Sequence, residues 1–466
     1  LGDNFPYRPE DRGFQEVVRH GAGGIGQTPD YWNNAYFDDT YFHNGKPQKY
    51  KGYCTDVFFS EAKRFIKSRA DQGKPFFAYI SSNAPHSPFH CPEKYVKPYR
   101  GHEGIDEKTA IFFGMIANID ENVGALRSWL AEEGLDQKTI FIFMTDNGSA
   151  TGWRFYNAGM RGHKGRAYEG GHRVPFFLHW PAGGFDAPQD VDRLTAHVDI
   201  LPTLMELCQL NPLDDYLLDG KSIVPLLRNP QAEWPERVII TDSQRVVDPV
   251  KWKQSSTMTE RWRMIDGKEL YDIFADPGQQ NDVADQHPEV MTKLRSAYDA
   301  WWEDISPAFE KTSRIYVGNP AENPAVLTAH DWITGGKMPP WNQTNVRTTR
   351  AVDSYKWAIK VEQPGTYRIA LRRWPRESGL SLRSGAEPGE PVPGLEANRE
   401  TEGVALPITE ARIEIAGQTK SMDIPNDMPE AVFEMELPAG DTDLKAHFTL
   451  KSGEEIGAYY AYVEKL

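Results

Sequence analysis

Two oxygen-bearing side chains, Asp146 and Asn147, belong to the motif 145–148, which directly follows an apolar run of the sequence. The run, residues 139–144, is rich in branched and aromatic residues, which predicts a buried strand. In open α/β sheets, ligands bind beyond the carboxyl ends of the strands. A carboxylate and a carboxamide at that place suit a hard cation such as Ca²⁺, whereas a histidine in place of Asn147 would favour Zn²⁺. For Asp-Asn-Gly taken alone, a tight turn is the alternative interpretation.

Two further loops carry groups that could act on an anion. The apolar run 76–80 predicts another strand, and His86 lies in the polar loop after it, between two prolines. Downstream, a glycine-rich cationic loop contains Lys164 and leads into an expected strand at 174–180. A lone loop histidine or lysine is usually solvated surface. Together, however, the three loops supply cation ligands, an imidazole and an ammonium group, which suits transfer of a tetrahedral oxyanion.

These motifs, in this order, resemble those of the formylglycine-dependent, arylsulfatase-like sulfatases of the alkaline phosphatase superfamily. The matching segments are 83–88, 145–148, 161–165 and 169–175, with weaker agreement at 199–204 and 269–277. The resemblance implies an alkaline-phosphatase-like sulfatase fold, which is an α/β sheet with helices on both faces and a small antiparallel α+β subdomain. It also implies hydrolysis of sulfate esters, with sulfated carbohydrates as the substrates.

The resemblance further implies a role for each motif residue. Asp146 and Asn147 would supply two oxygen ligands of one Ca²⁺, and Lys164 would hydrogen-bond the sulfate and stabilise the leaving oxygen. His86 would donate a proton to the bridging oxygen, a role for which imidazole is suited near neutral pH; a loop histidine that caps backbone carbonyls is the alternative. Candidates for substrate contacts are His163, Arg166 and His90, although the first two could equally pack the loop.

The nucleophile of the family has no counterpart in this chain. It is a formylglycine made from Cys or Ser in a Cys/Ser-x-Pro-x-Arg motif. No serine of this chain begins such a motif, and none of its three cysteines does: Cys54, Cys91 and Cys208. The early Asp-Asp strand that completes the family's metal site is also missing, and the chain begins with Leu1 instead of Met. We therefore expect a fragment cut inside the catalytic domain and inactive by itself. A degenerate, non-catalytic homologue is the alternative.

Composition excludes some classes of function. The net charge of −15 argues against a nucleic-acid-binding protein, because phosphate contacts require clustered cations. No apolar run approaches the ~18 residues of a membrane span. Three cysteines at irregular spacing do not make a disulfide framework. Positive charge is instead concentrated locally, near the proposed site, at Arg161, Lys164, Arg166 and Arg173.

The sequence divides into three parts. Residues 1–235 alternate strand-like and helical patterns, as expected for the sulfatase catalytic domain without its N-terminal portion; the clearest helix is predicted at 106–133, with Asp106 as N-cap and Gly134 after its end. Residues 236–310 combine strand-like runs with a helix from Pro288, as in the smaller subdomain of the sulfatase fold. Residues 311–466 show period-two alternation and Pro/Gly-rich loops, which predicts an accessory β-sandwich.

Two other functions stay open at this stage. One is hydrolysis of phosphonates or phosphate monoesters by a member of the same superfamily; the other is non-catalytic carbohydrate binding by the β-sandwich. Tryptophans in β-sandwiches usually belong to the core, which favours a structural or substrate-cleft role for this domain. By resemblance, we also expect export to the periplasm or the medium. A formylglycine-generating enzyme or an anaerobic maturase would modify the full-length protein.

Overall fold

The computed structural model describes residues 2–211, 217–244, 246–349, 355–426 and 428–466. Their contacts divide the chain into two compact units. The first unit combines residues 1–126 with residues 312–466, and the second contains residues 127–311. This division follows contacts in space, whereas the three domains expected from the sequence follow its helix and strand patterns together with the resemblance. Their boundaries stay a prediction.

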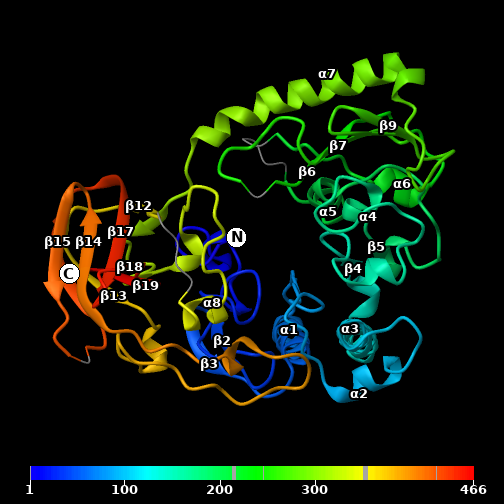
Figure 1. Cartoon of the computed structure of the whole chain (residues 1–466). Helices are drawn as coiled ribbons and strands as arrows, with labels where there is room; N and C mark the ends of the chain where they lie inside the picture. The colour runs from blue at the N-terminus through cyan, green and yellow to red at the C-terminus, as the bar shows by residue number, and fades with distance from the viewer. Residues whose placement is uncertain (1, 212–216, 245, 350–354, 427) are drawn as a thin grey trace. The chain divides into compact units, whose positions relative to one another are not determined.

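The C-terminal part of the first unit consists of two β-sheets around one hydrophobic core (Figure 1). The strand orders are β10-β12-β17-β14-β15, with β18 on β17, and β11-β19-β13-β16. All pairs are antiparallel except the parallel pair β10 and β12. The strands are β10 Ile315–Val317, β11 Ala325–Thr328, β12 Trp357–Val361, β13 Gly365–Arg372, β14 Ile408–Ile415, β15 Gln418–Asp423, β16 Ala431–Leu437, β17 Gly440–Leu450, β18 Glu455–Gly457 and β19 Tyr460–Lys465. The sheet-rich character predicted for this region is confirmed, although the region also contains one short helix, α8 Gln343–Arg347, which the sequence did not predict.

Most aromatic residues in and beside these strands belong to the core. Tyr355, Trp357 and Tyr367 are buried, and the indole Nε1 of Trp357 donates to the carbonyl oxygen of Thr328 at 2.6 Å. The alternation of buried and exposed residues along β16 has the period of two that a sheet with one covered face requires. Buried rings cannot stack on a sugar from solvent, which supports a structural role for these aromatics.

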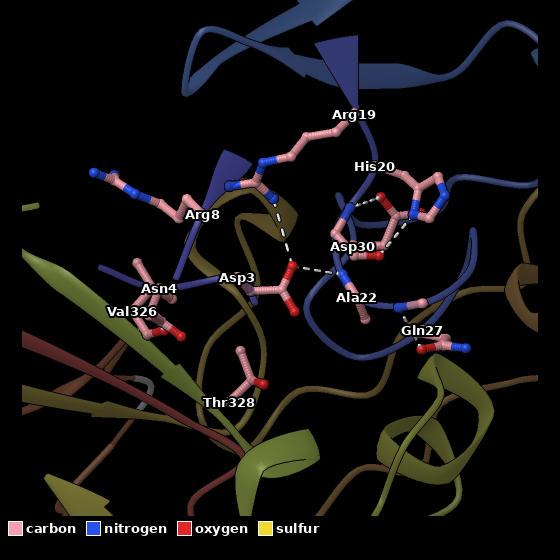
Figure 2. A network of polar contacts seen from close by, with 12 residues as sticks. Asp3, Asn4, Arg8, Arg19, His20, Ala22, Gln27, Asp30, Val326 and Thr328 are labelled. Atoms are coloured by element: carbon pink, nitrogen blue, oxygen red, sulfur yellow. Dashed lines mark hydrogen bonds and ion pairs between the residues drawn. The ribbon is translucent and has the colours of Figure 1, made fainter. Parts of the chain in front are cut away.

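The N-terminal segment of the first unit lies against the second of these sheets (Figure 2). The side-chain amide of Asn4 donates to the carbonyl oxygen of Val326 in β11 at 2.9 Å. Beside it, the carboxylate of Asp3 accepts the backbone N–H of Ala22 at 2.7 Å and lies 3.4 Å from the guanidinium of Arg19. The contact between Asn4 and Val326 cannot be predicted from the sequence, because the two residues are 322 positions apart.

A buried carboxylate shapes the glycine-rich loop in the same segment. Asp30 accepts the backbone N–H groups of Gly21 at 3.1 Å and Gly26 at 2.8 Å, together with the side-chain amide of Asn34 at 3.1 Å. Despite these hydrogen bonds, burial raises the pKa of Asp30 to about 7. The loop is therefore organised around a group that titrates near neutral pH.

The remaining elements of the first unit include the long helix α3. The others are β1 Val18–Arg19, β2 Thr40–His43 and β3 Lys46–Lys49, which form an antiparallel sheet, and the helices α1 Cys54–Asp71 and α2 Glu93–Val96. Helix α3 spans Glu107–Glu132 and continues into the second unit. Its predicted ends are confirmed: the side chain of Asp106 accepts the N–H of Thr109 at 2.8 Å, and Gly134 has φ +67°.

The second unit contains a strand pair and a four-stranded antiparallel sheet. Strands β4 (Phe141–Met144) and β5 (Phe176–His179) pair antiparallel. The sheet β6-β7-β8-β9 comprises Ile239–Asp242, Ser255–Met258, Trp262–Ile265 and Glu269–Asp272. Helix α7, Pro288–Ile305, packs Met291 and Leu294 on Met264 and Leu270 of this sheet. The short helices are α4 Glu169–His172, α5 Ile200–Leu207 and α6 Val224–Arg228.

One expected strand is not formed. Residues 76–80 have no regular secondary structure, and Phe77 and Tyr79 are exposed. A strand needs a neighbour for its backbone hydrogen bonds, and no described segment pairs with this one. Among the described residues, none of the helices has the length and apolar character needed to cross a bilayer.

Candidate functional site

Asp146 and Asn147 lie directly beyond the end of β4, as predicted. The carboxylate of Asp146 is exposed, and the side-chain amide of Asn147 hydrogen-bonds to it. The two head groups are therefore adjacent, and a half-turn of the amide would bring two oxygen atoms together. The imidazole Nε2 of His197, which the sequence did not single out, lies 3.0 Å from the carbonyl oxygen of Thr145 and fixes the start of this turn.

Glycines let the Asp-Asn turn and the cationic loop interlock. The backbone N–H of Gly148 donates to the carbonyl oxygen of Gly171 at 3.0 Å, and the N–H of Lys164 is 3.4 Å from the carbonyl oxygen of Ser149. A Cβ atom on Gly148 would lie only 1.9 Å from the carbonyl oxygen of Gly170, and one on Gly171 would lie 1.9 Å from that of Arg166. No other residue fits at either position. The structure thus brings two of the three predicted loops together.

The cationic loop presents Lys164 next to an aromatic stack. The imidazole of His163 stacks on the indole of Trp153, with ring centroids 4.6 Å apart and an interplanar angle of 19°. Its Nδ1 lies 3.1 Å from the carbonyl oxygen of Lys164. Lys164 is half-buried and Arg166 exposed, and neither forms an ion pair with a described residue. Both cations are therefore available to an anionic ligand.

A buried ion pair anchors the same loop to the four-stranded sheet. The carboxylate of Glu169 lies 2.6 Å from Nε of Arg263 in β8, and their side chains are 2% and 6% exposed. Burial would raise the pKa of Glu169, but the hydrogen bond with His172 and the charge of Arg263 lower it to about 2. The backbone N–H of Glu169 donates to the side-chain oxygen of Gln279 at 2.8 Å. Sequence reasoning assigned no role to Glu169, Arg263 or Gln279.

Two of the four cations expected at the site are engaged elsewhere. The guanidinium of Arg161 lies over the ring of Tyr168, 4.0 Å from its centroid, and donates to the hydroxyl of Tyr271 and the carbonyl oxygen of Gln279, both at 2.9 Å. Arg173 lies 3.5 Å from the carboxylate of Glu169. Arg161 thus holds the loop and Arg173 is paired with Glu169, whereas Lys164 and Arg166 are the two of these four cations that form no ion pair with a described residue.

His86 belongs to the first unit. It is exposed, and its Nδ1 lies 2.7 Å from the carbonyl oxygen of Ser87, while its own carbonyl oxygen accepts the hydroxyl of Tyr36 at 3.0 Å. The backbone on both sides contains cis peptide bonds, before Pro85 and Pro88. With Nδ1 engaged, Nε2 is the nitrogen that can meet a substrate. The contact is compatible with the catalytic role and also with the carbonyl-capping alternative.

His90, by contrast, has no access to solvent. Its ring meets that of Tyr36 edge-on, with centroids 5.2 Å apart, and neither ring nitrogen has a hydrogen-bond partner among the described residues. Burial, with a further contribution from Arg399, lowers the pKa of His90 to about 4. A substrate contact by His90 stays a prediction, and it would require the surrounding side chains to open.

The oxygen atoms of Asp146 and Asn147 are of the kind that binds a hard cation. Asp146 and Asn147 offer a carboxylate and an amide oxygen, and the described residues contain no cluster of three His, Cys, Asp or Glu side chains that could hold a metal. Calcium takes six to eight oxygen ligands. The two residues can therefore form part of such a site, and other oxygen atoms must complete it.

Comparison with known proteins identifies the family. The Sulfatase family model matches residues 3–210, and a second model, N-sulphoglucosamine sulphohydrolase, C-terminal, matches residues 162–301. An uncharacterized sulfatase, YdeN, of Escherichia coli (strain K12) is 27% identical over 245 residues, which is 50% of this chain and 41% of that protein. An N-acetylgalactosamine-6-O-sulfatase of Bacteroides thetaiotaomicron is 27% identical over 262 residues, or 51% of this chain and 49% of that protein.

A solved structure agrees with the sequence matches. Ps i-CgsB, in a complex with k-i-k-neocarrahexaose, has a TM-score of 0.57 and 26% identity, and the alignment covers 65% of this chain and 69% of that one. The chain spans about half the length of the first curated relatives it matches. The matched regions contain the Asp-Asn turn, the cationic loop and the anchoring sheet. The chain belongs to the sulfatase family, within the alkaline phosphatase superfamily, and has the mixed α/β fold of that family together with a C-terminal region of two β-sheets.

Proposed function

We propose that the whole protein hydrolyses sulfate esters of carbohydrates. The observation that carries this proposal is the interlocking of the Asp-Asn turn with the cationic loop, because it fixes two oxygen donors and a free ammonium group within one folded unit. The relatives add the substrate class: one is named an N-acetylgalactosamine-6-O-sulfatase, and the solved structure is a complex with k-i-k-neocarrahexaose.

Each residue of the chain has a defined task in this proposal. Lys164 would bind a non-bridging sulfate oxygen and stabilise charge that develops on the leaving oxygen. His86 would deliver a proton from Nε2 to that oxygen, with its ring held through Nδ1. Asp146 and Asn147 would hold Ca²⁺, which neutralises charge on the sulfate when bound. The nucleophile would be a formylglycine outside residues 1–466, since no Cys/Ser-x-Pro-x-Arg motif occurs in this sequence.

The site residues, the calcium and the formylglycine all belong to this proposal. So do a maturase that makes the formylglycine and an extracellular or periplasmic location, where sulfated polysaccharides are accessible. A chain limited to Leu1–Leu466 is expected to give no turnover. Sulfate release by that chain, above the level of its His86→Ala variant, would contradict the assignment of the nucleophile.

The test of the activity uses the full-length protein. We expect release of sulfate from a sulfated oligosaccharide and from an activated aryl sulfate, and much slower cleavage of the matching aryl phosphonate and aryl phosphate. The Lys164→Ala variant provides the control for contaminating activity. Turnover of the phosphonate or the phosphate without turnover of either sulfate would replace the proposed function with that of a phosphoryl hydrolase.

A further inference from the structure

A short aromatic loop separates the Asp-Asn turn from the cationic loop, and the mechanism above gives it no role. The loop, residues 151–157, contains Trp153, Phe155 and Tyr156, with Arg154 among them. Tyr156 is 76% exposed and Phe155 53%. The aromatic residues that stabilise the β-sheets of the first unit are buried, so these exposed rings differ from them. Clustered, exposed apolar side chains in a folded protein usually mark a binding surface.

Hydrogen bonds hold the aromatic loop in a defined conformation. The hydroxyl oxygen of Ser149 accepts the backbone N–H groups of Thr151 at 3.1 Å and Gly152 at 2.8 Å. The N–H groups of Phe155 and Tyr156 both lie 3.0 Å from the carbonyl oxygen of Gly152. The rings therefore project from a tight turn that begins two residues after Asn147, and binding would not have to order the backbone first.

The side chain of Asn157 ties the end of this loop to the cationic loop. Its amide nitrogen donates to the carbonyl oxygen of Met160 at 2.7 Å and to that of Gly162 at 2.9 Å. The stack of Trp153 on His163 makes a second connection, directly beside Lys164. The aromatic loop and the ammonium group assigned to the sulfate thus belong to one local structure.

Positive charge accompanies the aromatic rings. The guanidinium of Arg154 lies 5.6 Å from the ring centroid of Trp153 and is exposed. Among the described residues, no carboxylate forms an ion pair with Arg154 or with Lys164. The surface therefore combines flat apolar rings, which suit the C–H face of a sugar ring, with cations that suit its sulfate groups.

We propose that Trp153, Arg154 and Tyr156 form a sugar subsite that holds a sulfated oligosaccharide beside the reacting sulfate. In this subsite, Tyr156 stacks on a pyranose ring, and Arg154 binds a second anionic group of the same chain. The inference rests on the proposed function, which it deepens: the natural substrate is a multiply charged oligosaccharide, and a small aryl sulfate does not reach the subsite.

The experiment compares two substrates in the full-length protein. For Tyr156→Ala, we expect KM on a sulfated carrageenan hexasaccharide to rise about three- to tenfold, the range that a lost aromatic contact gives, with kcat and the kinetics on an aryl sulfate unchanged. Arg154→Ala should act in the same direction, and Arg154→Lys should recover part of the loss. Phe274→Ala, at a residue of the same unit that is 67% exposed, is the matched control and should leave both substrates unaffected.

Binding measured without turnover separates this inference from the activity on which it rests. Calorimetric titration with the same hexasaccharide should show weaker binding to Tyr156→Ala, and little binding by either protein to the desulfated hexasaccharide. If the hexasaccharide binds in a way that depends on Tyr156 but no sulfate is released, the proposed sulfatase activity is refuted and the proposed sugar subsite is supported. Unchanged hexasaccharide kinetics in Tyr156→Ala, or an equal loss on the aryl sulfate, would overturn the subsite. A lower melting temperature would also overturn it, because it would show that another segment of the protein covers the ring.

Discussion

The buried ion pair between Glu169 and Arg263 gives the most direct test of how the cationic loop is held. The perturbation is Glu169→Gln, which keeps the shape of the side chain and removes its charge. Arg263 would then remain buried, with only neutral acceptors: the introduced amide and the carbonyl oxygens of Thr259 and Trp262. Its charge could no longer be compensated, because the side chain is only 6% exposed.

The size of the effect follows from this burial. Breaking a buried pair by removing one partner costs about 3–5 kcal/mol, because an uncompensated charge stays in the interior. For a unit of this size, each kcal/mol lowers the melting temperature by about 2–4 °C, so we expect a decrease of about 6–20 °C. Arg173→Ala is the control: it removes a cation 3.5 Å from the same carboxylate, but its side chain is 60% exposed, and the cost should stay below about 1 kcal/mol.

Thermal and urea unfolding would be followed with a probe in the second unit, since two units need not unfold in one transition. The pKa of Glu169 is lowered to about 2, so its contribution should be complete above its usual pKa of 4.5 and be lost as the pH falls toward 2. The double variant Glu169→Gln/Arg263→Met should recover most of the stability. Equal melting temperatures for Glu169→Gln and Arg173→Ala would refute the reasoning, as would a double variant no better than the single one.

Three further predictions concern the site and the first unit. Lys164→Ala in the full-length protein should lower kcat by about 10²–10³, more on a sulfated sugar than on an aryl sulfate, with no change in the melting curve; near-normal rates on both would place Lys164 outside the site. Elemental analysis should find one calcium per full-length chain and a loss of it in Asp146→Ala/Asn147→Ala, whereas stoichiometric zinc would contradict the oxygen-donor assignment. Because the pKa of Asp30 is raised to about 7, its stabilising contribution should be complete below pH 3.8 and be lost as the pH rises through 7. Melting curves of the first unit at pH 5 and 8 should show this decrease, and Asp30→Asn should reduce it.

Several features could be predicted from the sequence because their causes are local. The ends of α3 depend on Asp106 and Gly134, which act on backbone groups within a few residues. The β-sheets of the C-terminal region follow from a period of two in side-chain burial, which a single strand already displays. The family follows from short motifs whose spacing is a property of the sequence. The positions of Asp146 and Asn147 beyond β4 could also be predicted, because their motif, 145–148, follows the strand directly in the sequence.

Only the tertiary structure could decide how these pieces are held, because the responsible contacts join distant residues of unremarkable type. Nothing in the sequence around Arg263 indicates a partner 94 residues away in the cationic loop, and nothing near Asn4 points to Val326. Segment 76–80 shows the same dependence on tertiary structure, because the strand predicted there is not formed. Its apolar residues have the composition of a strand, but a strand forms only when a neighbouring strand satisfies its backbone hydrogen bonds, and that neighbour is a property of the fold.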